Sequence, residues 1–344
     1  MLLKRKFRKY LYRRPFIVDR LRKILYLKIL RNNFVYKNHV LKKAKKFAKE
    51  INYERPGLVL ETTFNCNASC IYCSRSKTEH SGTMSMDLFR KIIDDCVDRG
   101  IKSVTLSGWG DPLLDEHLFE RIEYITSHGL VYGVFTNGSR MNEYVSKKLL
   151  DSGGLVFINF SLGAFNKDIY ENIVKGLDRD KVYTNVINFL EFKRKRGLSK
   201  PHVAVSIVKI DLNLKDIRKF VNFWAHQEGV NEIVLNDLKD NVGQVNVRSI
   251  GKYTFRSKEG CWLSPCCFLF VKPCFYVYHD GRVSPCGQDT PRRELIIGDM
   301  NGQTINEIFT SREYDDLKEM HLKDQRKLHK VCGKCLRHSY WVYP

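Results

Sequence analysis

The clearest candidates for chemistry are three cysteines in one short stretch, Cys66, Cys70 and Cys73, spaced C-x3-C-x2-C. They follow an apolar run, Leu58–Leu60, which we expect to form a strand. Thiolates at this spacing can bind one face of a zinc ion or of an iron–sulfur cluster. Because a closed site needs four protein ligands, the fourth position is either supplied from a distant part of the chain or left open for a substrate.

A second group of cysteines lies in the C-terminal third of the chain. There, Asp280-Gly281 between two apolar runs predicts a hairpin, and a helix is expected over Thr304–His321. Cysteines on such a hairpin and on a C-x2-C turn after the helix can converge on one centre, and a zinc ribbon could use the same thiols. The group comprises Cys261, Cys266, Cys267, Cys274, Cys286, Cys332 and Cys335.

The eleven cysteines are grouped as in metal sites, and no secretory signal precedes them, which predicts a cytoplasmic protein without a disulfide framework. Cys96 stands apart and is expected in a helix core. No apolar run approaches the roughly 20 residues that a membrane-spanning helix needs. We therefore expect a protein that is soluble or at most peripheral at a membrane surface.

The net charge of +21 is concentrated at the N-terminus, where residues 1–50 contain 11 Lys and 7 Arg against Asp19 and Glu50. Phe16–Arg31 has the apolar spacing of an amphipathic helix, and a basic segment, Leu41–Lys49, follows it. This arm could pack on the rest of the protein through its apolar stripe. It could instead bind an anionic membrane surface or another polyanion such as a nucleic acid.

From about residue 54 the pattern alternates between strands and helices, which predicts parallel strands joined by right-handed crossovers. Six strands of this kind would form a partial (β/α)6 barrel of the TIM type, with the active-site loops at the C-terminal ends of the strands. Strands are expected at Leu58–Glu61, Ser103–Ser107, Val131–Thr136, Leu155–Ser161, Val203–Ile210 and Glu232–Asn236. Helices are expected at Met86–Asp98, Leu118–His128, Asn142–Asp151, Lys181–Arg196 and Leu214–Glu228.

The predicted organisation is thus an α/β protein in three parts: a basic helical arm (1–53), the partial barrel (54–246) and a small cysteine-rich α+β module (247–344). Polar and small residues follow several of the barrel strands, at the edge where the three-cysteine loop lies. Small residues let a backbone approach a ligand closely, although such residues also serve simply as turns and caps. They are the segments Ser107–Pro112 and Thr136–Ser139 and the single residues Asn159, Ser161, Ser206 and Asn213.

The three-cysteine loop, with Asn67 after its first cysteine and Tyr72 before its third, resembles the signature of the radical S-adenosylmethionine (SAM) enzymes. The resemblance implies that the three cysteines hold a [4Fe–4S] cluster whose fourth iron binds SAM. The segment Trp109–Pro112 resembles the family's GGEP turn, with Trp109 for the first Gly and Asp111 for Glu, and Thr136–Gly138 resembles its TNG turn. Gly163 stands where many relatives carry Asp. The implied SAM contacts are Tyr72, Gly108, Trp109, Gly110, Asp111, Asn137 and Ser161.

The C-terminal module resembles the SPASM/twitch extension of radical SAM enzymes through its Gly281-x4-Cys286 spacing and the phrase Ile297–Asp299 before a helix. Nine residues without a cysteine follow Cys335, which favours the shorter form with one auxiliary [4Fe–4S] cluster. The resemblance implies Cys286, Cys332 and Cys335 as three ligands of this cluster. It leaves the fourth open between Cys267, which is slightly favoured, and Cys274.

The resemblance covers about residues 56–344 and implies a radical SAM enzyme. Such an enzyme cleaves SAM reductively to a 5′-deoxyadenosyl radical, which takes hydrogen from a substrate. A ferredoxin- or flavodoxin-type electron donor is the expected partner. The sequence does not identify the substrate, which is either a small molecule or sugar or a peptide, and it does not identify a catalytic residue. The alternative is a non-catalytic iron–sulfur or zinc protein that contacts nucleic acid or a membrane through its arm.

Overall fold

The computed structural model describes residues 57–238, 267–270, 273–289 and 292–335, together with Phe16, Ile17, Asn38, Leu41, Lys42, Lys45, Lys46 and Ile250. The predicted helix Phe16–Arg31 therefore lies outside the described residues, except for Phe16 and Ile17, which are helical and exposed. No helix among the described residues is both long enough and apolar enough to cross a membrane.

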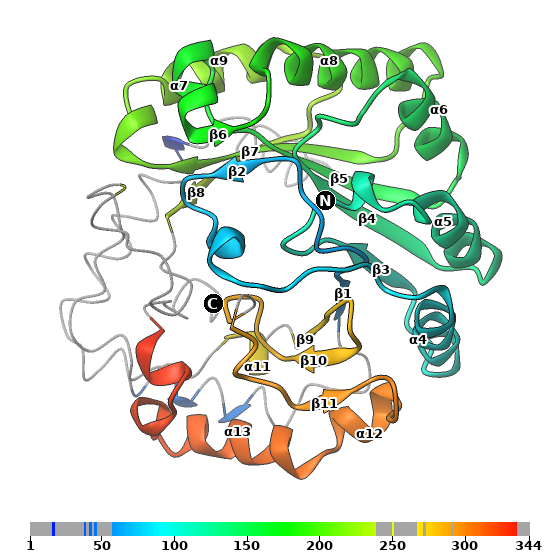
Figure 1. The fold of residues 1–344 in the computed structure, drawn as a ribbon, viewed down its shortest axis with the longest axis vertical. Coiled ribbons are helices and arrows are strands. Elements are labelled where there is room, and N and C mark those ends of the chain that lie inside the picture. The colour runs from blue at the N-terminus through cyan, green and yellow to red at the C-terminus, as the bar shows by residue number, and fades with distance from the viewer. Residues whose placement is uncertain are drawn as a thin grey trace.

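Six parallel strands form the barrel part of one nine-stranded sheet. They are β1 (Gly57–Leu60), β3 (Ser103–Leu106), β4 (Val131–Thr136), β5 (Leu155–Ser161), β7 (His202–Lys209) and β8 (Glu232–Asp237). Each of the five neighbouring pairs is parallel, and the sheet order β11-β10-β9-β1-β3-β4-β5-β7-β8 is open at β8 (Figure 1). The prediction of an open, partial barrel of six strands is confirmed.

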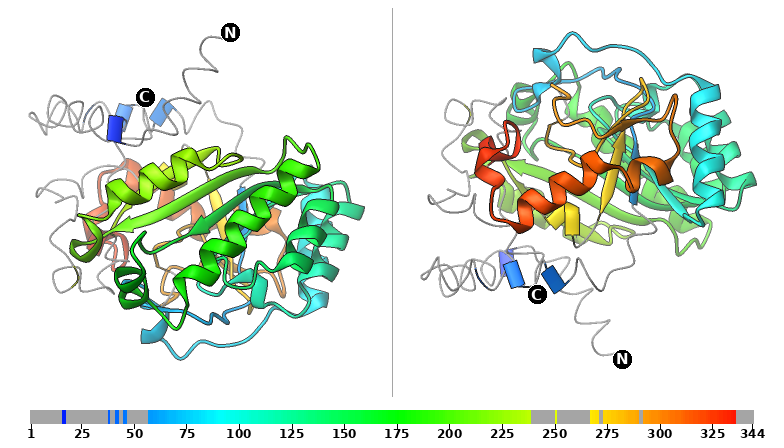
Figure 2. Two further views of the ribbon diagram at one scale, coloured as in Figure 1. Left: turned by 90° about the horizontal axis from the view of Figure 1, so that it is seen from above. Right: turned by 90° about the horizontal axis from the view of Figure 1, so that it is seen from below.

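Helices follow the barrel strands and cover one face of the curved sheet (Figure 2). Polar residues cap several of them: Ser85 accepts the backbone N–H of Leu88, and Asn142 accepts that of Val145. The helices are α4 (Met86–Asp98), α5 (Leu118–Ser127), α6 (Glu143–Asp151), α7 (Lys167–Ile173), α8 (Arg179–Lys195) and α9 (Ile217–His226). The five predicted helices agree with these bounds within a few residues, whereas the short α7 and the two-residue strands β2 (Ser69–Cys70) and β6 (Val174–Lys175) were not predicted.

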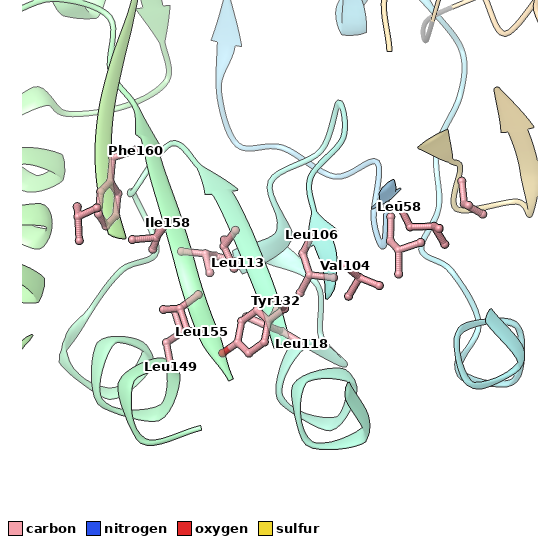
Figure 3. Close-up of a cluster of buried hydrophobic side chains, with 14 of the residues drawn as sticks. Leu58, Val104, Leu106, Leu113, Leu118, Tyr132, Leu149, Leu155, Ile158 and Phe160 are labelled. Atoms are coloured by element: carbon pink, nitrogen blue, oxygen red, sulfur yellow. The ribbon is translucent and has the colours of Figure 1, made fainter. Parts of the chain in front are cut away.

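The core lies between the strands and the helices, because alternate strand residues point toward the helices. Figure 3 shows Leu58, Leu106 and Ile158 among these side chains, each 2 % exposed or less, with Leu118 and Leu149 packing from α5 and α6. Burial of each such side chain stabilises the fold by roughly 1.5–3 kcal/mol. Polar residues such as Asn159 and Ser206 lie on the other face of the strands.

The C-terminal module continues the barrel sheet beyond β1. Strand β9 (Cys274–Val277) pairs in parallel with β1, and β10 (Arg282–Ser284) returns antiparallel after the predicted Asp280-Gly281 turn, in which Gly281 has φ 92°. The remaining elements of the module are α11 (Cys267–Phe270), β11 (Gly298–Asp299), α12 (Ile305–Phe309) and α13 (Arg312–Leu322).

The single helix predicted over Thr304–His321 is wrong, because two helices occupy this stretch. Helix α12 ends at Phe309, and Ser311 begins α13 by accepting the backbone N–H of Tyr314 with its side chain at 3.2 Å. A serine hydroxyl favours such a cap over a helix interior, which explains the break. Five short 3₁₀ turns complete the described elements: η1 (Ser74–Lys77), η2 (Pro112–Leu114), η3 (Asp211–Asn213), η5 (Arg326–Leu328) and η6 (Cys332–Lys334).

Candidate iron–sulfur and SAM site

The three-cysteine loop leaves the C-terminal end of β1 and crosses the concave side of the sheet (Figure 1). Its shape is held by Arg75, whose Nη2 donates to the carbonyl oxygens of Cys66 at 3.2 Å and Ala68 at 3.1 Å. The short strand β2 within the loop pairs with β6, which follows α7. The loop is therefore fixed from within by an arginine and from outside by a strand.

The loop is joined to the turn after β4, as expected for two segments at one edge of the sheet. The side-chain oxygen of Asn67 accepts hydrogen bonds from Asn137 Nδ2 at 3.1 Å and from Ser139 Oγ at 3.2 Å. Asn137 Nδ2 also lies 3.8 Å from Cys66 Sγ. The predicted site residues Cys66 and Asn137 are thus brought together.

The turn after β3 packs directly against the segment that leads into the cysteine loop. A Cβ at Gly110 would lie 2.1 Å from the carbonyl oxygen of Thr63, and one at Gly108 would lie 2.5 Å from Cγ of Glu61. Only glycine allows this approach at either position. The backbone N–H of Asp111 donates to Asn65 O at 2.8 Å, and that of Trp109 donates to Glu61 Oε2 at 3.1 Å.

The Asp111 carboxylate is 4 % exposed and is occupied by hydrogen bonds within the protein. It accepts Oγ1 of Thr136 at 2.9 Å and the backbone N–H groups of Asn137 at 2.7 Å and Leu113 at 3.0 Å. Burial raises the pKa of Asp111, and these donors oppose the rise. Its side chain joins the turns after β3 and β4, and its backbone is also engaged, because its N–H donates to Asn65 O and its carbonyl oxygen accepts Leu114 N. Asp111 therefore positions the two turns.

The three thiols lie in a partly buried environment that suits a cluster. Burial raises the pKa of Cys70 to about 12 and also raises the pKa of Cys66 and Cys73, while the Arg75 charge acts in the opposite direction on all three. Among the described residues, no three His, Cys, Asp or Glu side chains are gathered closely enough to hold one ion.

Tyr170, on α7, is a further residue that bears on whether this site fits an iron–sulfur cluster. Its hydroxyl is buried and has no hydrogen-bond partner within the described part of the chain. Burial raises the pKa of Tyr170, and the neighbouring Cys70 adds to the rise. A cluster sulfide or thiolate beside Cys70 would accept this hydrogen bond, and so the residues present fit a [4Fe–4S] cluster.

Polar residues also lie on the neighbouring strands β5 and β7 and directly after β7. Asn159 Nδ2 donates to Ser206 Oγ at 3.0 Å, and both residues are 4 % exposed. Ser161 is half-buried and pairs in register with Ser206 at the end of β5. Asn213 is different, because its side chain bonds Gly163 O, Val208 O and Ile210 N and is fully buried. Of the two roles that the sequence left open for Asn213, ligand contact or turn residue, its hydrogen bonds support the role in local structure.

Three of the C-terminal cysteines line a cavity. Cys286, Cys332 and Cys335 line it together with Leu269, Leu295 and several other residues (Pro285, Leu317, His321, Arg326 and Val331). Arg326 is 3 % exposed and donates to the carbonyl oxygens of Cys332 and Cys335, both at 3.3 Å. It holds the C-x2-C turn as Arg75 holds the first loop.

Cys274 and Cys267 are the two candidates for the fourth ligand of the auxiliary cluster, and the structure describes the side chain of Cys274 alone. Cys274 does not line the cavity, and its Sγ faces Gly57 on β1, where a Cβ would lie 3.6 Å from it. Burial alone raises the pKa of Cys274 to about 12. Cys267 begins α11, the helix that contributes Leu269 to the cavity wall, and its side chain lies outside the described residues.

Several residues of the site were not predicted from the sequence, among them Arg75, Tyr170 and Arg326. Arg75 lies two positions after Cys73 and Arg326 six before Cys332, but basic residues are common throughout the chain. Their roles follow from hydrogen bonds to backbone carbonyls, which leave no pattern in a sequence.

Comparison with known proteins agrees with this geometry. Residues 60–223 match the model of the radical SAM superfamily, and residues 266–336 match that of the SPASM iron–sulfur cluster-binding domain. A tungsten-containing aldehyde ferredoxin oxidoreductase cofactor-modifying protein of Pyrococcus furiosus is 25% identical over 293 residues, which are 75% of this chain and 81% of that protein.

A GTP 3',8-cyclase of Desulforamulus reducens is 28% identical over 153 residues, which are 43% of this chain and 45% of the cyclase. The chain thus spans about half the length of that cyclase. The solved structure of anSMEcpe with bound AdoMet and Cp18Cys peptide shares the fold, with a TM-score of 0.62 at 18% identity over 82% of this chain and 86% of that chain. Because the two family models match the barrel and the module that hold the two cysteine sites, the chain belongs to the radical SAM superfamily, as a SAM- and [4Fe–4S]-dependent enzyme with a SPASM-type iron–sulfur domain.

Proposed function

We propose that this enzyme cleaves SAM reductively at a cluster held by Cys66, Cys70 and Cys73 and uses the product to take hydrogen from a substrate. When bound, the cluster and SAM supply a 5′-deoxyadenosyl radical. The observation that carries the proposal is the joining of the three-cysteine loop to both polar turns, through Asn67 to Asn137 and through Asn65 to Asp111. A cluster ligand set and a cofactor-binding edge are thereby held in one rigid arrangement.

The turn after β3 is suited to the ammonium group of SAM. The N–H groups of Trp109 and Asp111 are bound to Glu61 and Asn65 and therefore point away from the site. The carbonyl groups of Gly108, Trp109 and Gly110 then remain as hydrogen-bond acceptors. A cationic amine carries only donors and therefore binds to such acceptors. Tyr72, Asn137 and Ser161 complete the proposed SAM contacts.

The cavity lined by C-terminal cysteines is proposed to hold an auxiliary [4Fe–4S] cluster on Cys286, Cys332, Cys335 and Cys267. Cys267 is preferred to Cys274 because α11 lies at the cavity wall, whereas the Cys274 thiol faces β1. Arg326 places its positive charge beside this site and offsets the negative charge of four thiolates.

The proposed substrate is a peptide or an organic cofactor. Support comes from the Pyrococcus furiosus relative, which covers 75% of this chain and is named for cofactor modification, and from the peptide bound to the similarly folded anSMEcpe. The proposed reductant is a ferredoxin or flavodoxin. The basic residues 1–50 are proposed to bind a polyanion or an anionic membrane surface.

The test is anaerobic reconstitution with iron and sulfide, followed by dithionite and SAM. Wild type is expected to form 5′-deoxyadenosine and Cys66→Ala to form almost none, whereas the matched Cys96→Ala, in the core of α4, should retain activity. Equal rates for Cys66→Ala and wild type would contradict the assignment.

The auxiliary cluster is tested by the iron content. Wild type should hold about eight irons per chain and a Cys332→Ala/Cys335→Ala variant about four, as two four-iron clusters require. Four irons plus zinc in wild type would contradict the auxiliary cluster.

A further inference from the structure

A buried ionic network joins the auxiliary module to the turn proposed to bind SAM. At its centre is Glu61, which directly follows β1 and is 3 % exposed. One carboxylate oxygen, Oε1, accepts Arg293 Nη2 at 2.8 Å and lies 3.1 Å from His279 Nδ1. The other, Oε2, accepts the backbone N–H of Trp109 at 3.1 Å. The same carboxylate thus contacts the module on one side and the SAM turn on the other.

Arg293 has a strained backbone conformation, and its buried side chain is fixed by several contacts. Its side chain is fully buried, its backbone has φ 52°, and its guanidinium lies 4.4 Å from the ring centre of Tyr278 and 5.7 Å from that of Phe64. Nη1 donates to Asp280 Oδ2 at 2.6 Å. A non-glycine residue in the left-handed region is strained and persists where its surroundings fix it, which is common at functional positions.

The loop that carries Arg293 also forms the wall of the auxiliary cavity. Cys286, which precedes Arg293, and Leu295, which follows it, both line the cavity. The N–H of Arg293 donates to Asp289 O at 2.9 Å, and the Asp289 side chain accepts the N–H of Leu295 at 2.5 Å. A change at the cavity that moves this loop therefore moves the arginine that holds Glu61.

Glu61 in turn determines the position of the SAM turn. Gly108 packs so closely on it that a Cβ there would lie 2.5 Å from Glu61 Cγ. The hydrogen bond from Trp109 N to the carboxylate engages this N–H and holds the backbone of the turn at Trp109. If the carboxylate shifts, the turn loses both its packing surface and its acceptor.

We propose that Glu61 and Arg293 are positioning residues through which the auxiliary site controls SAM binding. The proposal rests on the proposed SAM-cleaving function and adds a coupling between its two sites. Arg293 keeps Glu61 in place, and Glu61 keeps the turn at Gly108–Gly110 in its SAM-binding shape. Loss of the auxiliary cluster frees the loop, and SAM binding weakens without a direct contact between the sites.

The first test compares the KM for SAM in 5′-deoxyadenosine formation by reconstituted enzyme. Arg293→Met and Glu61→Met should each raise this KM about tenfold, as expected for loss of one hydrogen bond to a charged group, while kcat changes little. Glu61→Gln keeps an oxygen acceptor for Trp109 N but turns its NH2 group toward Arg293 Nη2, so its KM should lie between those of wild type and Glu61→Met. Arg292→Met, which removes the same charge from the exposed neighbouring side chain, should leave the KM unchanged.

A single substitution leaves one buried charge without its partner, which can impair folding. Glu61→Met/Arg293→Met avoids this, because it removes both charges together and replaces them with apolar groups of similar size. This variant should fold with full iron content and still show the raised KM for SAM, because Trp109 N has lost its acceptor. A folded, iron-replete double variant with the wild-type KM would overturn the positioning role.

The coupling between the two sites is tested by adding Cys332→Ala/Cys335→Ala to wild type and to Glu61→Met/Arg293→Met. In wild type these substitutions should raise the KM for SAM, and in Glu61→Met/Arg293→Met they should raise it no further. Equal effects in the two backgrounds would overturn the coupling. If wild type forms no 5′-deoxyadenosine, the proposed function itself fails; if it does and the variants bind SAM as wild type does, only the present inference fails.

Discussion

The carboxylate of Asp111 accepts the backbone N–H of Asn137 at 2.7 Å, which joins the turn after β3 to the turn after β4. The two residues are 26 positions apart and follow neighbouring parallel strands. Because the same carboxylate also accepts Thr136 Oγ1 and Leu113 N, one buried group fixes the mutual position of two segments proposed to bind SAM.

Asp111→Asn should therefore weaken both stability and SAM binding. An amide has one acceptor oxygen and turns its NH2 group toward donors, so at least one buried donor is left without a partner. The expected loss is about 1–3 kcal/mol in the free energy of unfolding, with a raised KM for SAM. Urea unfolding and SAM-dependent kinetics measure the two effects. Asp98→Asn, on the exposed end of α4, is the control and should change neither; equal unfolding curves for the two variants would contradict the role of Asp111.

Arg75→Met should reduce the iron content of the first site and lower the reduction potential of its cluster. Arg75 donates to two carbonyls of the cysteine loop, and each such bond to a charged group contributes about 1.5–3 kcal/mol. Its positive charge also favours the more negative, reduced cluster. Iron analysis and a redox titration followed by EPR measure the changes.

Arg75→Lys separates these two contributions, because it keeps the charge and loses the planar fork. Its potential should lie nearer to that of wild type, while its iron content falls. Arg194→Met, on the exposed end of α8, controls for overall charge. A potential in Arg75→Met equal to that of wild type would show that the arginine charge does not act on the cluster.

Arg121→Met should destabilise the barrel by about 3–5 kcal/mol. Arg121 Nε lies 2.8 Å from Asp115 Oδ2, both side chains are fully buried, and the substitution leaves the carboxylate without its partner. A matched surface pair exists nearby: Arg90 Nη2 lies 2.7 Å from Glu120 Oε1, with side chains 42% and 48% exposed. Arg90→Met should cost less than about 1 kcal/mol. Urea unfolding of both variants measures the contrast, and similar losses would contradict it.

Asp289→Asn should flatten the pH dependence of stability between about pH 4 and pH 6. Burial raises the pKa of Asp289 from its ordinary 3.8 to about 6. In this interval the folded protein keeps a proton that the unfolded chain has released, so this group's contribution to stability falls as the pH rises. The loss is about 1.4 kcal/mol for each pKa unit.

Asparagine carries no charge at any of these pH values and can still accept the N–H of Leu295. Relative to wild type, the variant should therefore gain stability between pH 5 and pH 7.5. Anaerobic urea midpoints at both pH values measure this gain, and a constant difference between the two proteins would contradict the raised pKa.

The sequence alone determined the order of the six barrel strands and five of the helices, and their bounds to within a few residues, because helix and strand periodicities are local properties. It also predicted the proposed first cluster site, since the three cysteines lie within eight residues of one loop. The hairpin at Asp280-Gly281 was predictable for the same reason: a two-residue turn defines its own geometry.

Only the tertiary structure decided how distant parts of the chain meet. Strand β9 joins the sheet beside β1, and Arg293 reaches Glu61 across 232 positions of sequence. The Cys274 thiol faces β1, although its spacing alone left it a candidate ligand. Such contacts depend on which strand edges pair and which buried charges must be compensated, and these are properties of the assembled core that no short stretch of sequence contains.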